Sequence, residues 1–186
     1  MTSLEAVESF TRFLNEAGVS YMVVGSFSSN YHGIPRSTKD ADIVLQFDAA
    51  AWHLFSGNLP EGLTLDSQGG FEMVTATRKE IVRVEGTLFD IEVFHLSGDP
   101  FDQSRFSRRR KVDLGDGLIA WVATAEDVIV QKIRWLKNAN RTKDYEDVLN
   151  VLRRKKELLD FKYIENWCDQ HGTLEILAKA REEAAV

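Results

Sequence analysis

Two aspartates separated by one residue, Asp40 and Asp42, begin an apolar run that follows a polar segment. Side chains alternate between the two faces of a β-strand, so a strand over 40–47 places both carboxylates on the same face. Two ionised carboxylates this close repel each other, and the repulsion raises the pKa of one of them unless a cation lies between them. Hard divalent cations bind carboxylate oxygens, and Mg²⁺ keeps positions open for substrate phosphates. The pair therefore indicates a metal site used in phosphate chemistry.

A third carboxylate is expected on a strand over 87–95, where Asp90 and Glu92 alternate with apolar residues. If this strand lies beside the first, Asp90 meets the aspartate pair across the ladder, where opposite side chains are about 5 Å apart. Glu92 faces the same way as Asp90, so it can replace or assist it. A solvated sheet face with scattered acids is the alternative for Asp90 alone, but the nearby pair favours the metal site.

Gly25 ends a buried apolar run, and Ser26 starts a short predicted helix. Unpaired backbone N–H groups at a helix start suit a phosphate, and glycine permits close approach. A Gly-Ser pair alone is a weak signal, because many helices begin with a serine cap. The sequence has neither a Walker loop nor a Gly-x-Gly-x-x-Gly string, and its four histidines and Cys168 lack the spacing of zinc ligands.

The composition of the chain bounds its class. Its 186 residues suit one domain with a helical appendage, and its net charge of −6 argues against a general nucleic-acid coat. A single cysteine, together with the lack of a signal peptide or a membrane-length apolar run, predicts a cytoplasmic protein. Basic residues gather over 105–111 and 153–156. Each basic cluster taken alone fits a solvated surface, although local phosphate binding is also compatible with it.

Apolar periodicity predicts an α+β fold. Helices are expected over 3–17, 26–32 and about 48–56, and later near 125–137, 141–155, 161–170 and 173–184. Strands are expected over 19–24, 40–47, 71–76, 80–84 and 87–95, the last two joined at Glu85-Gly86, and a further hairpin over 110–122 turns at 115–117. The predicted architecture is a mixed β-sheet flanked by helices over 1–122, with a C-terminal helical subregion over 123–186 that packs on it as a single compact unit.

Four segments, met in order between about residues 19 and 152, resemble the polymerase-β-like nucleotidyltransferases. The first, Val23 to Asp42, has an apolar residue, Gly-Ser, a spacer with His-Gly and Arg-Ser-Thr, and then Asp-x-Asp. This string is particularly similar to small bacterial nucleotidyltransferase-like proteins related to the toxins of toxin–antitoxin pairs. The remaining segments are 88–93, 123–132 and 141–147.

The resemblance implies roles for the matching positions. Asp40, Asp42 and Asp90 would hold Mg²⁺ or Mn²⁺, and Asp90 would help to activate the attacking hydroxyl. Gly25 and Ser26 would bind the triphosphate. The nucleotide site would also include Arg36, Thr38 and Asp144.

Lys132 would reach the phosphates from its helix, as the resemblance implies. It falls on the side of that helix that carries Val128, Ile129 and Leu136, where a lysine that only aids solubility is not expected. A lysine that extends its ammonium past apolar neighbours fits equally well. The charged residues over 141–147, Asp144 among them, also fit ordinary i,i+3 and i,i+4 helix pairs.

The function expected is transfer of a nucleoside monophosphate from an NTP, such as ATP, to a hydroxyl acceptor, with release of pyrophosphate. The acceptor is an RNA end, a protein or a small molecule, and an antitoxin partner is compatible with the resemblance. The alternative is a catalytically inactive module of the same fold that binds a nucleotide or a partner. A third hypothesis is an RNA-directed enzyme that uses the basic cluster over 105–111.

Overall fold

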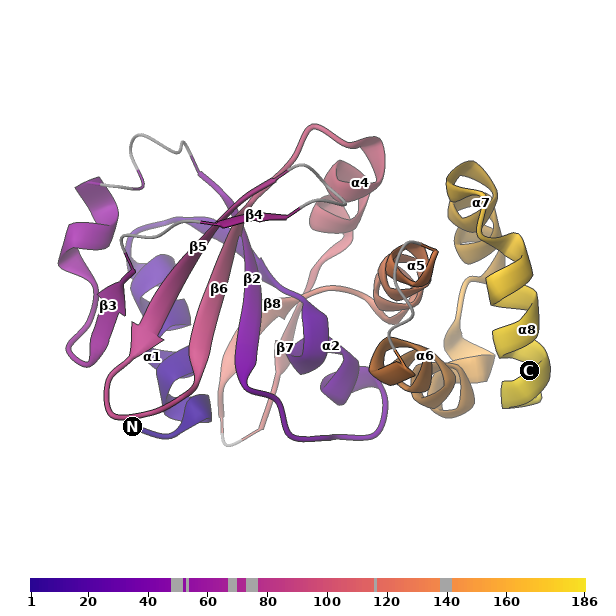
Figure 1. The fold of residues 1–186 in the computed structure, drawn as a ribbon, viewed down its shortest axis with the longest axis horizontal. Coiled ribbons are helices and arrows are strands. Elements are labelled where there is room, and N and C mark those ends of the chain that lie inside the picture. The colour runs from indigo at the N-terminus through magenta and orange to yellow at the C-terminus, as the bar shows by residue number, and fades with distance from the viewer. Residues whose placement is uncertain (48–51, 53, 67–69, 73–76, 116, 138–141) are drawn as a thin grey trace. The chain divides into compact units, whose positions relative to one another are not determined.

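The computed structural model describes residues 1–47, 52, 54–66, 70–72, 77–115, 117–137 and 142–186. They form two compact units: Met1–Ser26 with Thr38–Val122, and Phe27–Ser37 with Ala123–Val186. Figure 1 shows the elements of each. The chain crosses between the units at 26–27, 37–38 and 122–123. Helix α2 (Gly25–His32) therefore begins in the first unit and ends in the second.

Within the described part of the first unit, eight strands form one mixed sheet. The order is β3-β5-β6-β2-β1-β8-β7, and β4 pairs with β5. The strands are β1 Ser20–Val23, β2 Asp40–Gln46, β3 Leu63–Leu65, β4 Gly70–Glu72, β5 Thr77–Val84, β6 Asp90–His95, β7 Arg110–Asp113 and β8 Ile119–Val122. The β1–β8 and β2–β6 pairs are parallel, and the other pairs are antiparallel.

Period-two alternation gives this sheet one apolar face. Ala41, Ile43 and Leu45 on β2 are fully buried, and so are Ile91 and Val93 on β6. Helix α1 (Ser3–Glu16) begins with a capping box between Thr2 and Glu5 and buries Val7, Phe10 and Leu14. Because the apolar side chains of β2 are committed to the core, its alternate residues, which begin with Asp40, must face the other way.

The second unit contains helices α5 (Ala125–Leu136), α6 (Thr142–Lys155), α7 (Phe161–His171) and α8 (Leu174–Ala184), together with most of α2. The hydroxyl of Thr124 caps α5 by accepting a hydrogen bond from the N–H of Asp127. The left-handed Gly172 ends α7. No helix in the described ranges is long and apolar enough to cross a membrane.

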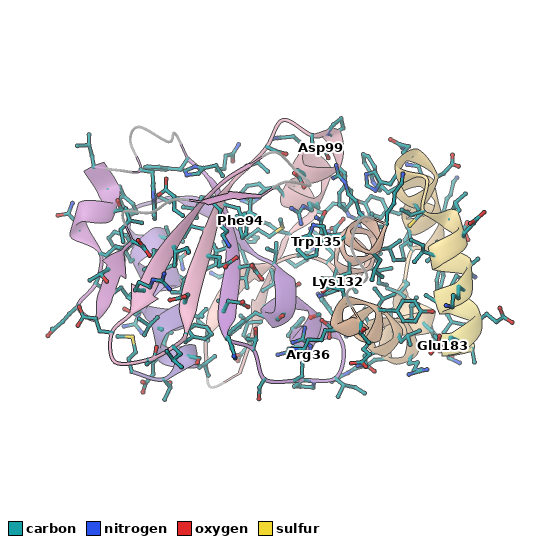
Figure 2. All side chains as sticks on the ribbon, in the orientation of Figure 1. Arg36, Phe94, Asp99, Lys132, Trp135 and Glu183 are labelled. Carbon is teal, nitrogen blue, oxygen red and sulfur yellow. The ribbon has the colours of Figure 1, made fainter. Side chains whose placement is uncertain are left out.

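The α+β organisation and the order of most elements agree with the sequence prediction. Among the described elements, β3, helix α4 (Pro100–Arg108) and the short 3₁₀ helix Lys156–Leu158 were not predicted. Asp99, labelled in Figure 2, caps α4 by accepting hydrogen bonds from the N–H groups of Phe101 and Asp102. The helix expected over 48–56 and the strand expected over 71–76 fall partly on residues outside those described.

Candidate active site

Four carboxylates lie on one face of the sheet, on strands β2 and β6. The parallel register pairs Asp40 with Asp90 and Asp42 with Glu92. Because neighbouring strands are about 4.8 Å apart, each acid of β2 stands beside an acid of β6. All four residues are half-buried. The strand of Asp90 is thus the direct neighbour of the strand that carries the aspartate pair.

Two basic side chains of β5 form ion pairs with the acids of β6. Arg83 lies opposite Asp90 in the antiparallel register, and its Nη1 is 2.5 Å from Asp90 Oδ2. Its Nη2 is 2.8 Å from Asp66 Oδ2. The hydrogen bond to Asp66 and the charge of Asp90 raise the pKa of Arg83 above its ordinary value. Lys79 Nζ lies 2.7 Å from Glu92 Oε1. Neither cation was singled out from the sequence.

The donor set of this face suits a hard divalent cation, because all its acids offer oxygen ligands. The carboxylates of Asp90 and Glu92 are, however, engaged by Arg83 and Lys79. Among the side chains that the structure describes, no three His, Cys, Asp or Glu residues gather closely enough to hold a metal ion. The chemistry of the residues fits Mg²⁺ or Mn²⁺, and a change of side-chain partners would be needed to bring three ligands together.

Gly25 fits the turn between β1 and α2 for two reasons. Its φ is +57°, in the left-handed region that favours glycine. A Cβ at this position would lie 1.8 Å from Asp42 Oδ2, which is a severe overlap. The backbone N–H of Val24 also donates to the carbonyl of Asp42 over 2.8 Å. The Asp42 carboxylate therefore occupies the space that the missing side chain leaves. Ser26 follows as the second residue of α2.

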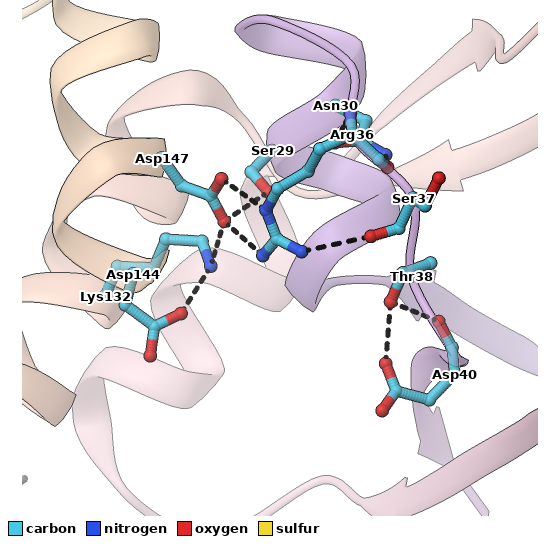
Figure 3. A network of polar contacts seen from close by, with 9 residues as sticks. All are labelled: Ser29, Asn30, Arg36, Ser37, Thr38, Asp40, Lys132, Asp144 and Asp147. Atoms are coloured by element: carbon cyan, nitrogen blue, oxygen red, sulfur yellow. Dashed lines mark hydrogen bonds and ion pairs between the residues drawn. The ribbon is translucent and has the colours of Figure 1, made fainter. Parts of the chain in front are cut away.

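Thr38, two residues before β2 begins, contacts the first aspartate of the pair. Its hydroxyl lies 2.9 Å from Asp40 Oδ1 and 3.1 Å from the carbonyl oxygen of Asp40 (Figure 3). In this arrangement the threonine orients the carboxylate. The direct nucleotide contact that the resemblance implies for Thr38 stays a prediction.

Lys132 lies in a buried ionic network of the second unit (Figures 2 and 3). Its Nζ is 2.8 Å from Asp144 Oδ1 and 2.9 Å from Asp147 Oδ2, and its side chain is only 3% exposed. The guanidinium of Arg36 donates two hydrogen bonds to the carboxylate of Asp147, from Nε over 2.9 Å and from Nη2 over 2.8 Å. The structure therefore brings together three of the predicted residues, Arg36, Lys132 and Asp144, around Asp147.

Asp147 is the residue that the sequence interpretation undervalued, since it was treated as one half of an ordinary helix pair. Burial opposes its ionisation. The hydrogen bond from Arg36 and the charge of Lys132 outweigh that burial, so the pKa of Asp147 lies below its ordinary value. The signal for Asp147 was its i,i+3 spacing from Asp144 on α6, which places both acids on one face.

The basic cluster over 105–111 is partly committed to the fold. Arg105 is buried and pairs with Asp102 at 2.8 Å. The guanidinium of Arg109 lies over Phe106 and Trp121, at 4.2 and 5.1 Å from the ring centres. Burial lowers the pKa of Arg109 from its ordinary value. Arg110 and Lys111 on the edge strand β7 are exposed, so they are the members best placed to meet an external phosphate.

Comparison with solved structures identifies the fold. ANT(2'')-Ia in complex with adenylyl-2''-tobramycin is similar with a TM-score of 0.64 at 12% identity, over 94% of this chain and 99% of that one. A nucleotidyltransferase-like antigen from Paracoccidioides brasiliensis gives 0.53 at 16% identity, over 96% and 92%. Helicobacter pylori JHP933 gives 0.56 at 11% identity, over 97% and 77%.

These likenesses confirm the predicted nucleotidyltransferase-like α+β fold. At identities this low they establish the fold alone. No family model matches the sequence, and no curated protein matches it. The activity must therefore be argued from the chain's own residues.

Proposed function

We propose that the protein is a nucleotidyltransferase that moves a nucleoside monophosphate from an NTP to a hydroxyl. The observation that carries this proposal is the register that sets Asp40 beside Asp90 and Asp42 beside Glu92 on one sheet face. Gly25, which leaves room for Asp42 at the start of α2, adds a backbone turn suited to phosphate. The fold gives the proposal its context.

Asp40, Asp42 and Asp90 would hold the divalent cation, with Glu92 as a substitute or an aid for Asp90. Mg²⁺ or Mn²⁺ supplies charge neutralisation at the phosphates and lowers the pKa of the attacking hydroxyl when bound. Gly25 and Ser26 would bind the triphosphate through backbone N–H groups, and Lys132 and Arg36 would supply positive charge. Asp90 would complete the metal site and help to activate the acceptor hydroxyl.

A second candidate is a module of this fold that binds a nucleotide or a partner without turnover. The ion pairs of Asp90 with Arg83 and of Glu92 with Lys79 favour it, because they engage the proposed third metal ligand and its substitute. The two candidates differ in turnover. Both require nucleotide or partner binding, but only the enzyme attaches label to an acceptor.

The deciding experiment incubates the protein with each radiolabelled NTP, Mg²⁺ and a cell extract, and asks which fraction takes up α-phosphate label. The double variant Asp40→Asn/Asp42→Asn is the matched control. Label that enters RNA, protein or small molecules with the wild type only identifies the acceptor class and supports the enzyme. Nucleotide binding without label in any fraction favours the module.

The relation to toxin components rests on the Gly-Ser…His-Gly…Arg-x-Thr-x-Asp-x-Asp string. If the protein is such a component, its expression should slow bacterial growth, and the double aspartate variant should not. Equal growth with both proteins would remove the toxin role while leaving nucleotidyl transfer open.

A further inference from the structure

The carboxylate of Asp147 accepts polar contacts from three residues of the second unit. Its carboxylate accepts from Arg36 on the 27–37 segment, from Lys132 on α5 and from Ser29 on α2, the last over 3.1 Å to Oδ2. The side chain itself projects from α6 and is 2% exposed. One carboxylate on α6 therefore joins the 27–37 segment, which includes Ser29 of α2, to α5.

Stability alone is a poor explanation for this arrangement. Removing charges from water is costly, and a well-packed apolar cluster of the same volume is often as stable or more stable. What a bidentate Arg–carboxylate pair adds is fixed geometry, because the planar guanidinium fork meets the two oxygens in one orientation. Asp147 thus restricts where the charges of Arg36 and Lys132 lie.

Arg36, whose guanidinium Asp147 holds in place, is connected to other residues proposed for the nucleotide site. Arg36 is two residues before Thr38, whose hydroxyl contacts Asp40. On its other side Arg36 is tied to α2, because Asn30 Nδ2 donates to its carbonyl over 2.7 Å and Asn30 Oδ1 accepts from its N–H over 3.1 Å. Lys132 keeps Asp144 as a second partner.

We infer that Asp147 is a positioning residue for nucleotide binding, which sets the Arg36 guanidinium and the Lys132 ammonium in one arrangement. This inference rests on the proposed function, since it assigns the two cations to the NTP. Asp147 acts through them and does not itself touch the substrate.

The test compares Asp147→Asn with Glu146→Gln, an exposed acid one residue away on the same helix. Hydrogen–deuterium exchange is measured over 27–37, with α8 as the internal reference, and the affinity for each Mg²⁺–NTP is measured by thermal shift. Because a lost hydrogen bond to a charged group is worth roughly tenfold or more in an equilibrium, we expect Asp147→Asn to speed exchange over 27–37 and weaken NTP binding by at least that factor. Exchange in α8 and all properties of Glu146→Gln should match the wild type.

Arg36→Gln provides a second route if Asp147→Asn folds poorly, because the Arg36 side chain is 28% exposed and its loss leaves the charge of Asp147 opposite Lys132. It should reproduce both effects, and the double variant should be no worse than Asp147→Asn alone. Exchange over 27–37 that stays at the wild-type rate overturns the inference. Faster exchange with unchanged NTP affinity overturns it too, since Asp147 is then purely structural. Failure of the wild type to bind any NTP refutes the proposed function instead, and the assignment of the cations with it.

Discussion

The carboxylate of Asp42 lies where a side chain on Gly25 would begin, with Oδ2 only 1.8 Å from the ideal Cβ position. Strand β2, which carries Asp40 and Asp42, therefore packs directly against the turn at Gly25 that is proposed to bind the triphosphate. A side chain on Gly25 would therefore have to displace the Asp42 carboxylate.

Gly25→Ala should be strongly destabilising, and Gly18→Ala is its matched control. Both glycines have positive φ, +57° and +68°, but a Cβ on Gly18 meets nothing within 4 Å. Gly18→Ala should cost about 1–2 kcal/mol for the left-handed backbone. Gly25→Ala should cost about 1–3 kcal/mol more for the overlap with Asp42. Urea denaturation measures both, and equal losses would show that the contact is unimportant.

Asp40→Asn/Asp42→Asn should abolish metal-dependent transfer while the fold stays intact. The two carboxylates share a strand face, so removing their charges relieves repulsion in metal-free buffer. The melting temperature without metal should therefore equal or exceed that of the wild type. A double variant that still transfers label, or that melts markedly lower, contradicts the metal-site assignment.

Mg²⁺ with a non-hydrolysable NTP should raise the melting temperature of the wild type. A ligand at one hundred times its dissociation constant adds about 2.7 kcal/mol to the free energy of unfolding, or roughly 5–10 °C for a domain of this size. Lys132→Ala should blunt the rise. It should also lower the ligand-free melting temperature, because Asp144 and Asp147 lose a buried counter-ion.

Lys132→Met separates the two effects, because it keeps the volume of the side chain and removes the charge. If Lys132→Met retains the full NTP-induced rise, Lys132 serves the fold and not the phosphates. If none of the four NTPs shifts the wild type, the nucleotide-binding proposal fails for the enzyme and the module alike.

His32 should make stability depend on pH near neutrality. Burial is the main cause that lowers its pKa below the ordinary 6.5, although the contact of Nε2 with the Ala123 carbonyl at 2.8 Å opposes the shift. The unfolded chain then binds the proton more readily, so stability is full above 6.5 and falls as pH drops through the lower folded pKa. Urea midpoints between pH 5 and 8 measure this loss, which His32→Gln should remove.

The lowered pKa of Asp147 acts in a more acidic window. Its contribution is full above the ordinary carboxyl pKa of 3.8 and is lost as pH falls through the folded value. A variant at His32 should therefore leave unchanged the loss of stability that occurs below pH 3.8.

The His32 prediction has its own contradicting outcome. A wild-type urea midpoint that stays constant from pH 8 to 5 would show that His32 ionises as readily in the folded protein as in the unfolded one.

Local sequence patterns predicted the strand face of the acids, but they did not predict the basic residue that pairs with Asp90. Alternation in β2 and β6 predicts which face Asp40, Asp42 and Asp90 share, because burial of the apolar face leaves only one orientation. Arg83 was missed because its position opposite Asp90 depends on the hairpin register. A two-residue turn at Glu85-Gly86 would set Arg83 opposite Leu88, whereas the connection between β5 and β6 spans 85–89 and sets it opposite Asp90. The Asp99 cap and Pro100 did signal α4, although its few apolar residues hid the helical period.

The network around Asp147 was beyond local patterns. Arg36 and Asp147 are 111 residues apart in the sequence, and nothing in either neighbourhood specifies the other. Charge and spacing indicate only that α6 has an acidic face. The grouping of 27–37 with the C-terminal helices, which creates the buried setting, is a tertiary property.

The final prediction concerns RNA as an acceptor. Arg105 and Arg109 serve the fold, so the residues to change are the exposed Arg110 and Lys111. If both grip single-stranded RNA phosphates, Arg110→Ser/Lys111→Ser should flatten the slope of log K against log salt by about 1.4, from about 0.7 per contact. Affinity should fall across RNA sequences, and NTP binding should be unchanged.

Filter binding of total tRNA at several salt concentrations measures the slope, with Arg12→Ser, a surface change on α1, as the control. The control should retain the wild-type slope, because its guanidinium pairs with Glu8 on the same helix. Negligible binding of the wild type at low salt, or a slope that the double variant leaves intact, excludes RNA contact through β7. The net charge of −6 then favours an acceptor that is a protein or a small molecule.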